Sequence, residues 1–348
     1  MSDTRAAPPA FPDDALAAER PWAAPLYPVA VALAARDAAG LAAWYGRLLG
    51  LETRRQGGLW QVGGLLRLRD APQARAERGD EPGLFHTAFL LPSRAALAGW
   101  LRHAAALGVA LEGASDHGVS DALYLSDPEG NGIEVYADRP RAGWPRPGAG
   151  ERIGMGTSRL DLPALLAEAP RAAPPPGVRI GHVHLRGGDI PATAAFYEGL
   201  GLEETHARPR ARFLASGGYH HHLAVNGWHS AGQRPEGLLG LDHVALAARD
   251  DAAWDRAAAG LRGAVRTAEG LAGRDPSGNG GAAGARLSTP AGAGGRPRRR
   301  TTRWQVRRCR DGAPERRGTG RVPRRSIRRG AGGCDRCQAL LKHGFTLV

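Results

Sequence analysis

Hydrophobic and polar positions follow one pattern four times along the chain. Each repeat opens with an apolar run of strand type, continues with apolar residues at helical spacing, and closes with short alternating runs around turn residues. In the first repeat these are a strand at 28–37, a helix at 38–52 and two or three short strands within 59–70. This order predicts a β-α-β-β-β module.

The other three repeats carry the same elements. The second has a strand at 85–92, a helix at 94–108 and a closing hairpin, while the third opens at 181–189 and the fourth at 241–250. The predicted helical segment AAWYGRLLGLE of the first repeat recurs in the third as AAFYEGLGLE. The segment VALAARD of the first repeat recurs in the fourth. Such repetition indicates one supersecondary unit used four times. The predicted fold class is α+β, with four βαβββ modules forming two domains.

The hairpin that closes the second module holds polar groups at fixed positions. Turn residues at 127–132, DPEGNG, separate the β-prone runs LYLS and IEVY, so Tyr124 lies late on one strand and Glu134 early on the next. Because side chains alternate along a strand, Glu134 lies on the face opposite Ile133 and Val135. One wall of the hairpin thus carries a carboxylate among apolar neighbours.

This run resembles the signature of type I extradiol ring-cleavage dioxygenases, members of the vicinal oxygen chelate superfamily together with glyoxalases and bleomycin-resistance proteins. In the signature a His is followed by an apolar residue and Tyr, then by D-P-x-G and a Glu. The matching residues here are His117, Leu123, Tyr124, Asp127, Pro128, Gly130 and Glu134. The departure is Ser115, where the family prefers Gly or a β-branched residue. The match covers the second module only, and it implies a catechol 2,3-dioxygenase-like protein with two cup-shaped domains.

In this superfamily the metal ligands come from the first and last strands of each module. The aligned first-strand positions hold Ala30, His86, His182 and His243. The last strand of the second module supplies Glu134. Two imidazoles and a carboxylate are the ligand set of non-heme Fe(II) oxygenases. The resemblance therefore implies Fe(II), with Mn(II) as the alternative, on His86, His182 and Glu134, and O2 as a co-substrate.

The resemblance also implies roles for three further residues. His221 would act as the acid/base, since an imidazole titrates near neutral pH. His117 would form a hydrogen bond with a substrate oxygen, and Tyr124 would orient or donate to the same group. Two alternatives stay open, because His184 shares a strand face with His182, and His221 stands between two other histidines, His220 and His222.

The ligand positions predict how the modules pair. The second module provides one part of the family's site and the third provides the other, whereas the first has Ala30 at the ligand position. We therefore expect modules two and three to share the metal cup, and modules one and four to form a degenerate pair in which His243 is structural. The alternative pairs module one with two and three with four.

Composition divides the chain into five segments. They are a disordered N-terminus at 1–26, a first domain at 27–139 with modules one and two, a linker at 140–179, a second domain at 180–285 with modules three and four and the last strand missing, and an Arg-rich disordered tail at 286–348. The pattern of the sequence changes abruptly after Gly280, which suggests a reading-frame shift in the gene. The alternative interpretation is a genuine nucleic-acid-binding arm.

The net charge of +13 comes from the C-terminal part of the sequence. Residues 281–348 hold 18 of the 47 basic and 3 of the 34 acidic residues, so the preceding part is close to neutral. All three cysteines also lie there, which argues against a disulfide framework in the domains. No apolar run approaches the roughly 18 residues of a membrane span, and no secretory pattern opens the chain.

The predicted function is extradiol cleavage of a catechol-type aromatic diol by a cytoplasmic protein, with a homo-oligomer allowed and no membrane partner. The alternative is a metal-independent ligand-binding or resistance protein of the same superfamily. A third class, nucleic-acid binding through the tail, predicts salt-dependent affinity that vanishes when 286–348 are removed.

Overall fold

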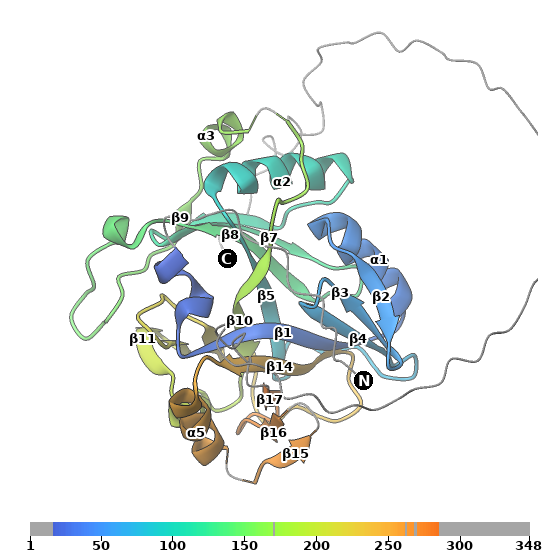
Figure 1. Ribbon diagram of the computed structural model, residues 1–348, viewed down its shortest axis with the longest axis vertical. Coiled ribbons are helices and arrows are strands. Elements are labelled where there is room, and N and C mark those ends of the chain that lie inside the picture. Colours follow the sequence, from blue (N-terminus) through green and yellow to red (C-terminus); the bar gives the residue numbers. More distant parts are fainter. Residues whose placement is uncertain (1–16, 170, 262, 268–269, 285–348) are drawn as a thin grey trace, which may run out of the picture. The chain divides into compact units, whose positions relative to one another are not determined.

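Two mixed β-sheets carry the described part of the chain, which in this computed structural model comprises residues 17–284 apart from 170, 262, 268 and 269 (Figure 1). The first sheet, called sheet 1/4, has the order β15 (Val265–Thr267), β16 (Gly270–Arg274), β17 (Gly280–Gly284), β14 (Gly240–Ala248), β1 (Leu26–Ala35), β4 (Leu66–Asp70), β3 (Leu59–Val62) and β2 (Thr53–Gln56). The second, called sheet 2/3, has the order β11 (Glu203–Arg208), β12 (Ala211–Ala215), β13 (Leu223–Asn226), β10 (Arg179–Arg186), β5 (Gly83–Leu91), β8 (Gly132–Asp138), β7 (Ser120–Ser126), β6 (Gly113–Asp116) and β9 (Ser158–Arg159).

The prediction that modules two and three share one sheet is confirmed. Their first strands, β5 and β10, run antiparallel side by side, and the first strands of modules one and four, β1 and β14, do the same in sheet 1/4. Each sheet therefore combines strands from both sides of the segment at 140–179. The division of the sequence at 139 and 180 into two domains stays a prediction.

The described residues form five α-helices, and each begins at a polar cap. They are α1 (Ala38–Leu49), α2 (Arg94–Ala106), α3 (Leu162–Ala167), α4 (Ile190–Gly199) and α5 (Asp251–Gly260). The capping side chains, which accept the backbone N–H three residues further on, belong to Asp37, Ser93, Asp161, Asp189 and Asp250. None of the helices in the described part of the chain is long and apolar enough to cross a bilayer.

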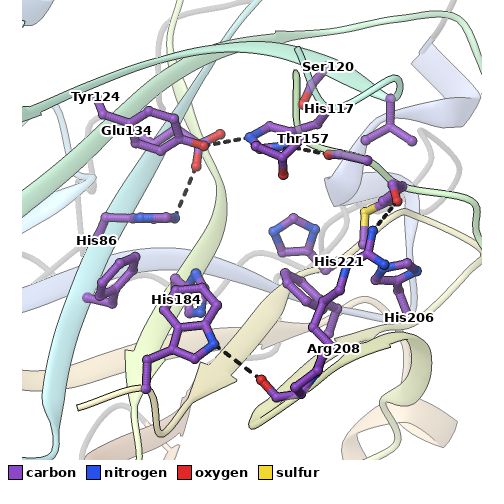
Figure 2. Close-up of a pocket in the computed structure, with 17 residues that line it drawn as sticks. His86, His117, Ser120, Tyr124, Glu134, Thr157, His184, His206, Arg208 and His221 are labelled. Atoms are coloured by element: carbon purple, nitrogen blue, oxygen red, sulfur yellow. Dashed lines mark hydrogen bonds and ion pairs between the residues drawn. The ribbon is translucent and has the colours of Figure 1, made fainter. Parts of the chain in front are cut away.

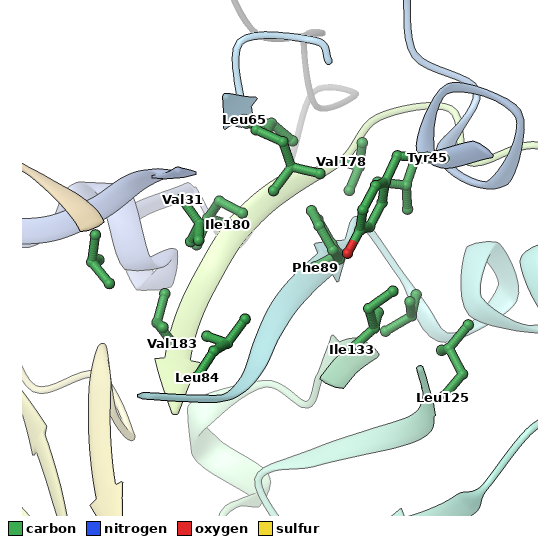
Figure 3. Close-up of a cluster of buried hydrophobic side chains, with 14 of the residues drawn as sticks. Val31, Tyr45, Leu65, Leu84, Phe89, Leu125, Ile133, Val178, Ile180 and Val183 are labelled. Carbon is green, nitrogen blue, oxygen red and sulfur yellow. The ribbon is translucent and has the colours of Figure 1, made fainter. Parts of the chain in front are cut away.

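One hydrophobic cluster joins the two sheets. Figure 3 shows Val31 of β1 close to Ile180 and Val183 of β10, with Phe89 of β5 and Ile133 of β8 in the same group. All five side chains are buried. Since Ile133 points into this cluster, strand alternation turns the next residue toward the opposite face of sheet 2/3. That face carries the candidate site.

A buried hydrogen bond ties the helix of one module to the closing turn of the next. The hydroxyl of Tyr45 in α1 donates to Asp127 Oδ2 at 2.9 Å, and Tyr197 in α4 donates to Asp275 Oδ2 at 3.2 Å. Asp127 also accepts from the backbone N–H of Glu129 and Asn131. The aspartate of the DPEG run is thus a structural residue of the turn. Both tyrosines are buried.

We expect Tyr45→Phe to lower the free energy of unfolding by about 1–3 kcal/mol, because Asp127 then loses a buried donor without replacement. Tyr197→Phe is the matched variant in the other half of the molecule, and a similar loss is expected there. Chemical denaturation of both variants measures the change. Unfolding free energies equal to the wild-type value would show that these bonds contribute nothing to stability.

Two predictions about the ends of the domains are wrong. Residues 17–26 are structured, as the 3-10 turns η1 (Ala17–Glu19) and η2 (Pro21–Ala23) and the first residue of β1. The reason is burial of this segment, since the Arg20 guanidinium donates to the Pro92 carbonyl at 2.8 Å and Trp22 packs on a second apolar cluster. Residues 1–16 and the tail predicted at 286–348 lie outside the described residues.

The last strand of module four is also present, contrary to the prediction. The Gly/Ala run of β17 pairs parallel with β14 and antiparallel with β16, in the place where β8 closes module two. A strand needs only backbone hydrogen bonds, so this run forms the ladder without the alternating apolar side chains that the prediction required.

The linker at 140–179 is partly structured as well. It contains η3 (Arg141–Gly143), the edge strand β9 and α3, which lies beside α2 (Figure 1). Its middle part passes over the face of sheet 2/3 that holds the candidate site.

Candidate metal centre

The strand register of sheet 2/3 brings three predicted ligands together around Ala88 of β5. Glu134 on β8 and His182 on β10 are both register partners of Ala88, one on each side. His86 stands two residues before Ala88 on β5 and therefore shares its face. Ala88 itself ends at its Cβ, so the space above it is free for the three longer side chains.

The three ligand atoms have separations that suit one metal ion. Glu134 Oε2 lies 3.0 Å from His86 Nε2 and 3.2 Å from His182 Nε2, and all three atoms lie within 4.8 Å of one another. Two ligands with bonds of about 2.1 Å at right angles to each other stand about 3 Å apart. His86 Nε2 is buried in contact with the Glu134 carboxylate and forms no other hydrogen bond to a described residue, so its lone pair can serve a metal ion. The residues present thus fit a divalent cation.

Protonation also favours a cation. Burial acts to raise the pKa of Glu134, but the charge and hydrogen bonds of His182 and His86 outweigh it and hold that pKa well below its usual range. Burial lowers the pKa of His182 to about 4, against the opposing charge of Glu134. At neutral pH the site therefore presents a carboxylate and a neutral imidazole, which are the forms that bind metal ions.

Next to the triad, His221 takes part in a chain of buried hydrogen bonds. His220 Nε2 lies 3.0 Å from Asp138 Oδ1, and since a carboxylate only accepts, His220 Nε2 carries a hydrogen and donates it. His220 Nδ1 then accepts from His221 Nδ1 at 2.8 Å, which leaves His221 Nε2 as the basic nitrogen. Burial, followed by the neighbouring His182, lowers the pKa of His221 well below its ordinary value, so the ring is neutral.

His117 and Tyr124 form a second hydrogen-bonded pair at the site. His117 Nδ1 donates to the Gly156 carbonyl at 2.9 Å, so its Nε2 is the acceptor for the Tyr124 hydroxyl at 2.7 Å. Burial and then the charge of Glu134 raise the pKa of Tyr124 well above its ordinary value, which keeps the phenol protonated. Both residues therefore line the cavity, and a hydrogen bond links their side chains.

A cavity of about 400 Å³ lies over this face and connects these groups. Figure 2 shows His86, Glu134, Tyr124, His117 and His221 around it. Its apolar walls include the rings of Phe85, Phe213 and Trp228. The cavity therefore offers a polar floor and flat aromatic sides, which suits a small planar ligand.

Comparison with known families matches both halves of the sequence. Residues 30–136 match the profile described as a Glyoxalase-like domain, and residues 179–293 match that of the Glyoxalase/Bleomycin resistance protein/Dioxygenase superfamily. Together the two matches cover more than half of the chain. The chain belongs to this superfamily.

A curated member of the superfamily resembles part of the chain. It is the protein named "Catechol-2,3-dioxygenase" of Bacillus subtilis (strain 168), which is 42% identical over 172 residues. The match covers 47% of this chain and 60% of that protein, so this chain spans less than two thirds of the relative.

The solved structures that resemble the chain are more distant in sequence. Glyoxalase I from Zea mays is 13% identical, with a TM-score of 0.46 over 74% of this chain and 91% of the other. The cppA protein from Streptococcus pneumoniae TIGR4 is 14% identical, with a TM-score of 0.40 over 73% of this chain and 97% of the other.

The remaining histidines that the superfamily pattern left open have partners elsewhere. His184 Nε2 accepts from the Asn226 side chain at 3.1 Å, and His222 lies between the Ser216 N–H and the Pro21 carbonyl. His243 pairs with Asp242 on sheet 1/4. A second trio within ligand distance, His182 with His220 and His221, shares His182 with the triad and contains no carboxylate.

Several residues around the cavity carry no signal in the sequence. Met155, Gly156 and Thr157 belong to the predicted linker, and Arg208 and Trp228 lie outside every motif of the superfamily considered above. Their positions depend on contacts made by the folded chain, such as the hydrogen bond between His117 and Gly156.

Proposed function

We propose that the protein is an Fe(II)-dependent extradiol dioxygenase that cleaves the ring of a catechol-type diol with O2. The observation that carries the proposal is the buried trio of His86, His182 and Glu134, with ligand atoms within 4.8 Å of one another, of which His86 and Glu134 line a cavity with aromatic walls. The Bacillus subtilis relative supports it, since the name of that protein states this activity. The cytoplasmic location and the homo-oligomer remain parts of the proposal.

The three ligands would hold Fe(II), or Mn(II) as the alternative, and such a set leaves coordination positions open. The bound ion would supply the redox chemistry by which O2 reacts with the diol. The chain's own residues then have separate tasks. His221 Nε2 would take a proton from a diol hydroxyl and return it later, and Tyr124, held by His117, would orient the neighbouring oxygen. The aromatic walls would hold the ring and exclude water.

The test is ring cleavage by the full-length protein after anaerobic loading with Fe(II). We expect a yellow product from catechol and one O2 consumed for each ring cleaved. A folded, iron-loaded protein that is inactive on a panel of catechols would contradict the proposal.

A metal-independent binding protein of the superfamily is the second candidate. The observation in its favour is the aromatic lining of the cavity, which would hold a planar ligand without any metal. The metal content of the purified protein separates the two functions. About one iron or manganese ion per chain favours the enzyme, whereas a metal-free protein that binds aromatic ligands favours the alternative.

A further inference from the structure

Arg208, at the end of β11, places an unpaired cation at the rim of the cavity. Its side chain is exposed and lines the cavity, and its guanidinium Nη2 donates to the Met155 carbonyl at 2.5 Å. Among the residues that the structure describes, no carboxylate forms an ion pair with it. A guanidinium has five N–H groups in a fixed plane, so most of its donors remain available to a ligand.

Arg208 and the three metal ligands would contact different chemical groups of one bound ligand. Figure 2 shows Arg208 across the cavity from Glu134, with His221 between them. The aromatic walls of the cavity include Phe213 and Trp228. A ring held between these walls would point one edge at the metal centre and the opposite edge at Arg208.

His206 adds a second polar atom beside Arg208. The ring is buried, and its Nδ1 lies 3.0 Å from Glu151 Oε1 and 3.1 Å from the Ile153 carbonyl. Both partners only accept, so the hydrogen is at Nδ1, and the buried Nε2 has no hydrogen-bond partner among the described residues. Burial, followed by the charge of Arg208, lowers the pKa of the free His206 ring. An anion at Nε2 would place a carboxylate on each side of the ring and offset the charge of Arg208, which favours the imidazolium form as a second donor.

We propose that the substrate carries a carboxylate on the edge of the ring opposite the diol, and that Arg208 and His206 bind this group. The inference rests on the proposed function for the placement of the diol, and on Arg208 and His206 for the carboxylate. A planar carboxylate matches a single guanidinium with two parallel hydrogen bonds. The two residues thus determine specificity at the end of the cavity away from the metal ligands.

The experiment compares three probes with the full-length protein, with and without Fe(II), in the absence of O2. The probes are protocatechuate, which is a catechol with a ring carboxylate, its neutral methyl ester, and catechol itself. Calorimetry measures binding, and turnover is measured afterwards in air. We expect protocatechuate to bind about tenfold more tightly than its ester, because the rim is partly screened by solvent. In Arg208→Gln this preference is expected to disappear.

Arg210→Gln is the matched control, since it removes the same charge from the same hairpin at a residue that does not line the cavity. It should keep the preference for the acid. Arg208→Lys keeps the charge without the planar fork and should retain part of it, which makes the test independent of whether the glutamine variant folds. Equal binding of acid and ester by the wild type, or an unchanged preference in a folded Arg208→Gln protein, overturns the inference.

The outcomes separate this inference from the proposed function. If no diol is cleaved but the Arg208-dependent preference for the acid is present, the carboxylate site stands and the dioxygenase proposal fails. If catechol is cleaved and the acid is not preferred over the ester, the dioxygenase stands and the carboxylate site fails.

Discussion

The Glu134→Gln variant is expected to lose its metal and, with it, all ring cleavage. Glu134 is the one carboxylate of the trio, and its Oε2 lies within 3.2 Å of both imidazole nitrogens. A glutamine keeps the size of the side chain but removes the negative charge that neutralises the ion. We expect metal affinity to fall by more than about 100-fold, since even the loss of an outer-shell partner costs 10- to 100-fold.

The measurement is metal content after loading and gel filtration, together with turnover of catechol. Glu112→Gln is the control, because Glu112 is exposed and stands outside the cavity. The circular dichroism spectrum of both variants should match that of the wild type. A Glu134→Gln protein that retains about one ion per chain would exclude Glu134 as a ligand.

His221→Gln is expected to lower kcat by about 100- to 10,000-fold while the protein keeps its metal, which is the range for loss of a general acid/base. The hydrogen-bonded chain from Asp138 through His220 leaves His221 Nε2 as the basic nitrogen. Glutamine preserves a polar side chain of similar length but cannot exchange a proton at neutral pH. The effect should therefore appear in turnover and leave iron binding unchanged.

His229→Gln provides the comparison, because His229 is exposed and does not line the cavity. Asp138→Asn adds a milder test of the same chain, since an asparagine no longer fixes the hydrogen of His220 at Nε2. Its loss of turnover should be smaller than that of His221→Gln. Wild-type kcat in an iron-loaded His221→Gln protein would remove His221 from the reaction.

The sequence predicted those parts of the site that depend on strand periodicity. Glu134 could be assigned to the face opposite Ile133 because alternation along a strand is strict, and the first-strand alignment selected His86 and His182. The same alignment, with Ala30 in the first module, predicted that modules two and three pair. The face of Glu134 follows from sheet geometry alone, whereas the choice of the two histidines and the pairing of the modules also needed the ligand positions that the family resemblance implies.

The parts that could not be predicted depend on contacts between distant segments. Gly156 reaches the site because its carbonyl accepts from His117, which is 39 residues away in the sequence. Residues 17–26 are structured because Arg20 reaches the Pro92 carbonyl, 72 residues away. The strand β17 was missed for the opposite reason, since its backbone pairs without any side-chain pattern. None of these features leaves a local signal in the sequence.

The central claim is that two imidazoles and one carboxylate from neighbouring modules share a single ion. X-ray absorption of the Fe(II)-loaded full-length protein, prepared without O2, tests it most directly. We predict one iron per chain with two imidazole ligands at about 2.1 Å, and one imidazole fewer in His182→Ala. A wild-type protein that binds no iron, or an imidazole count that does not change in His182→Ala, would contradict the account.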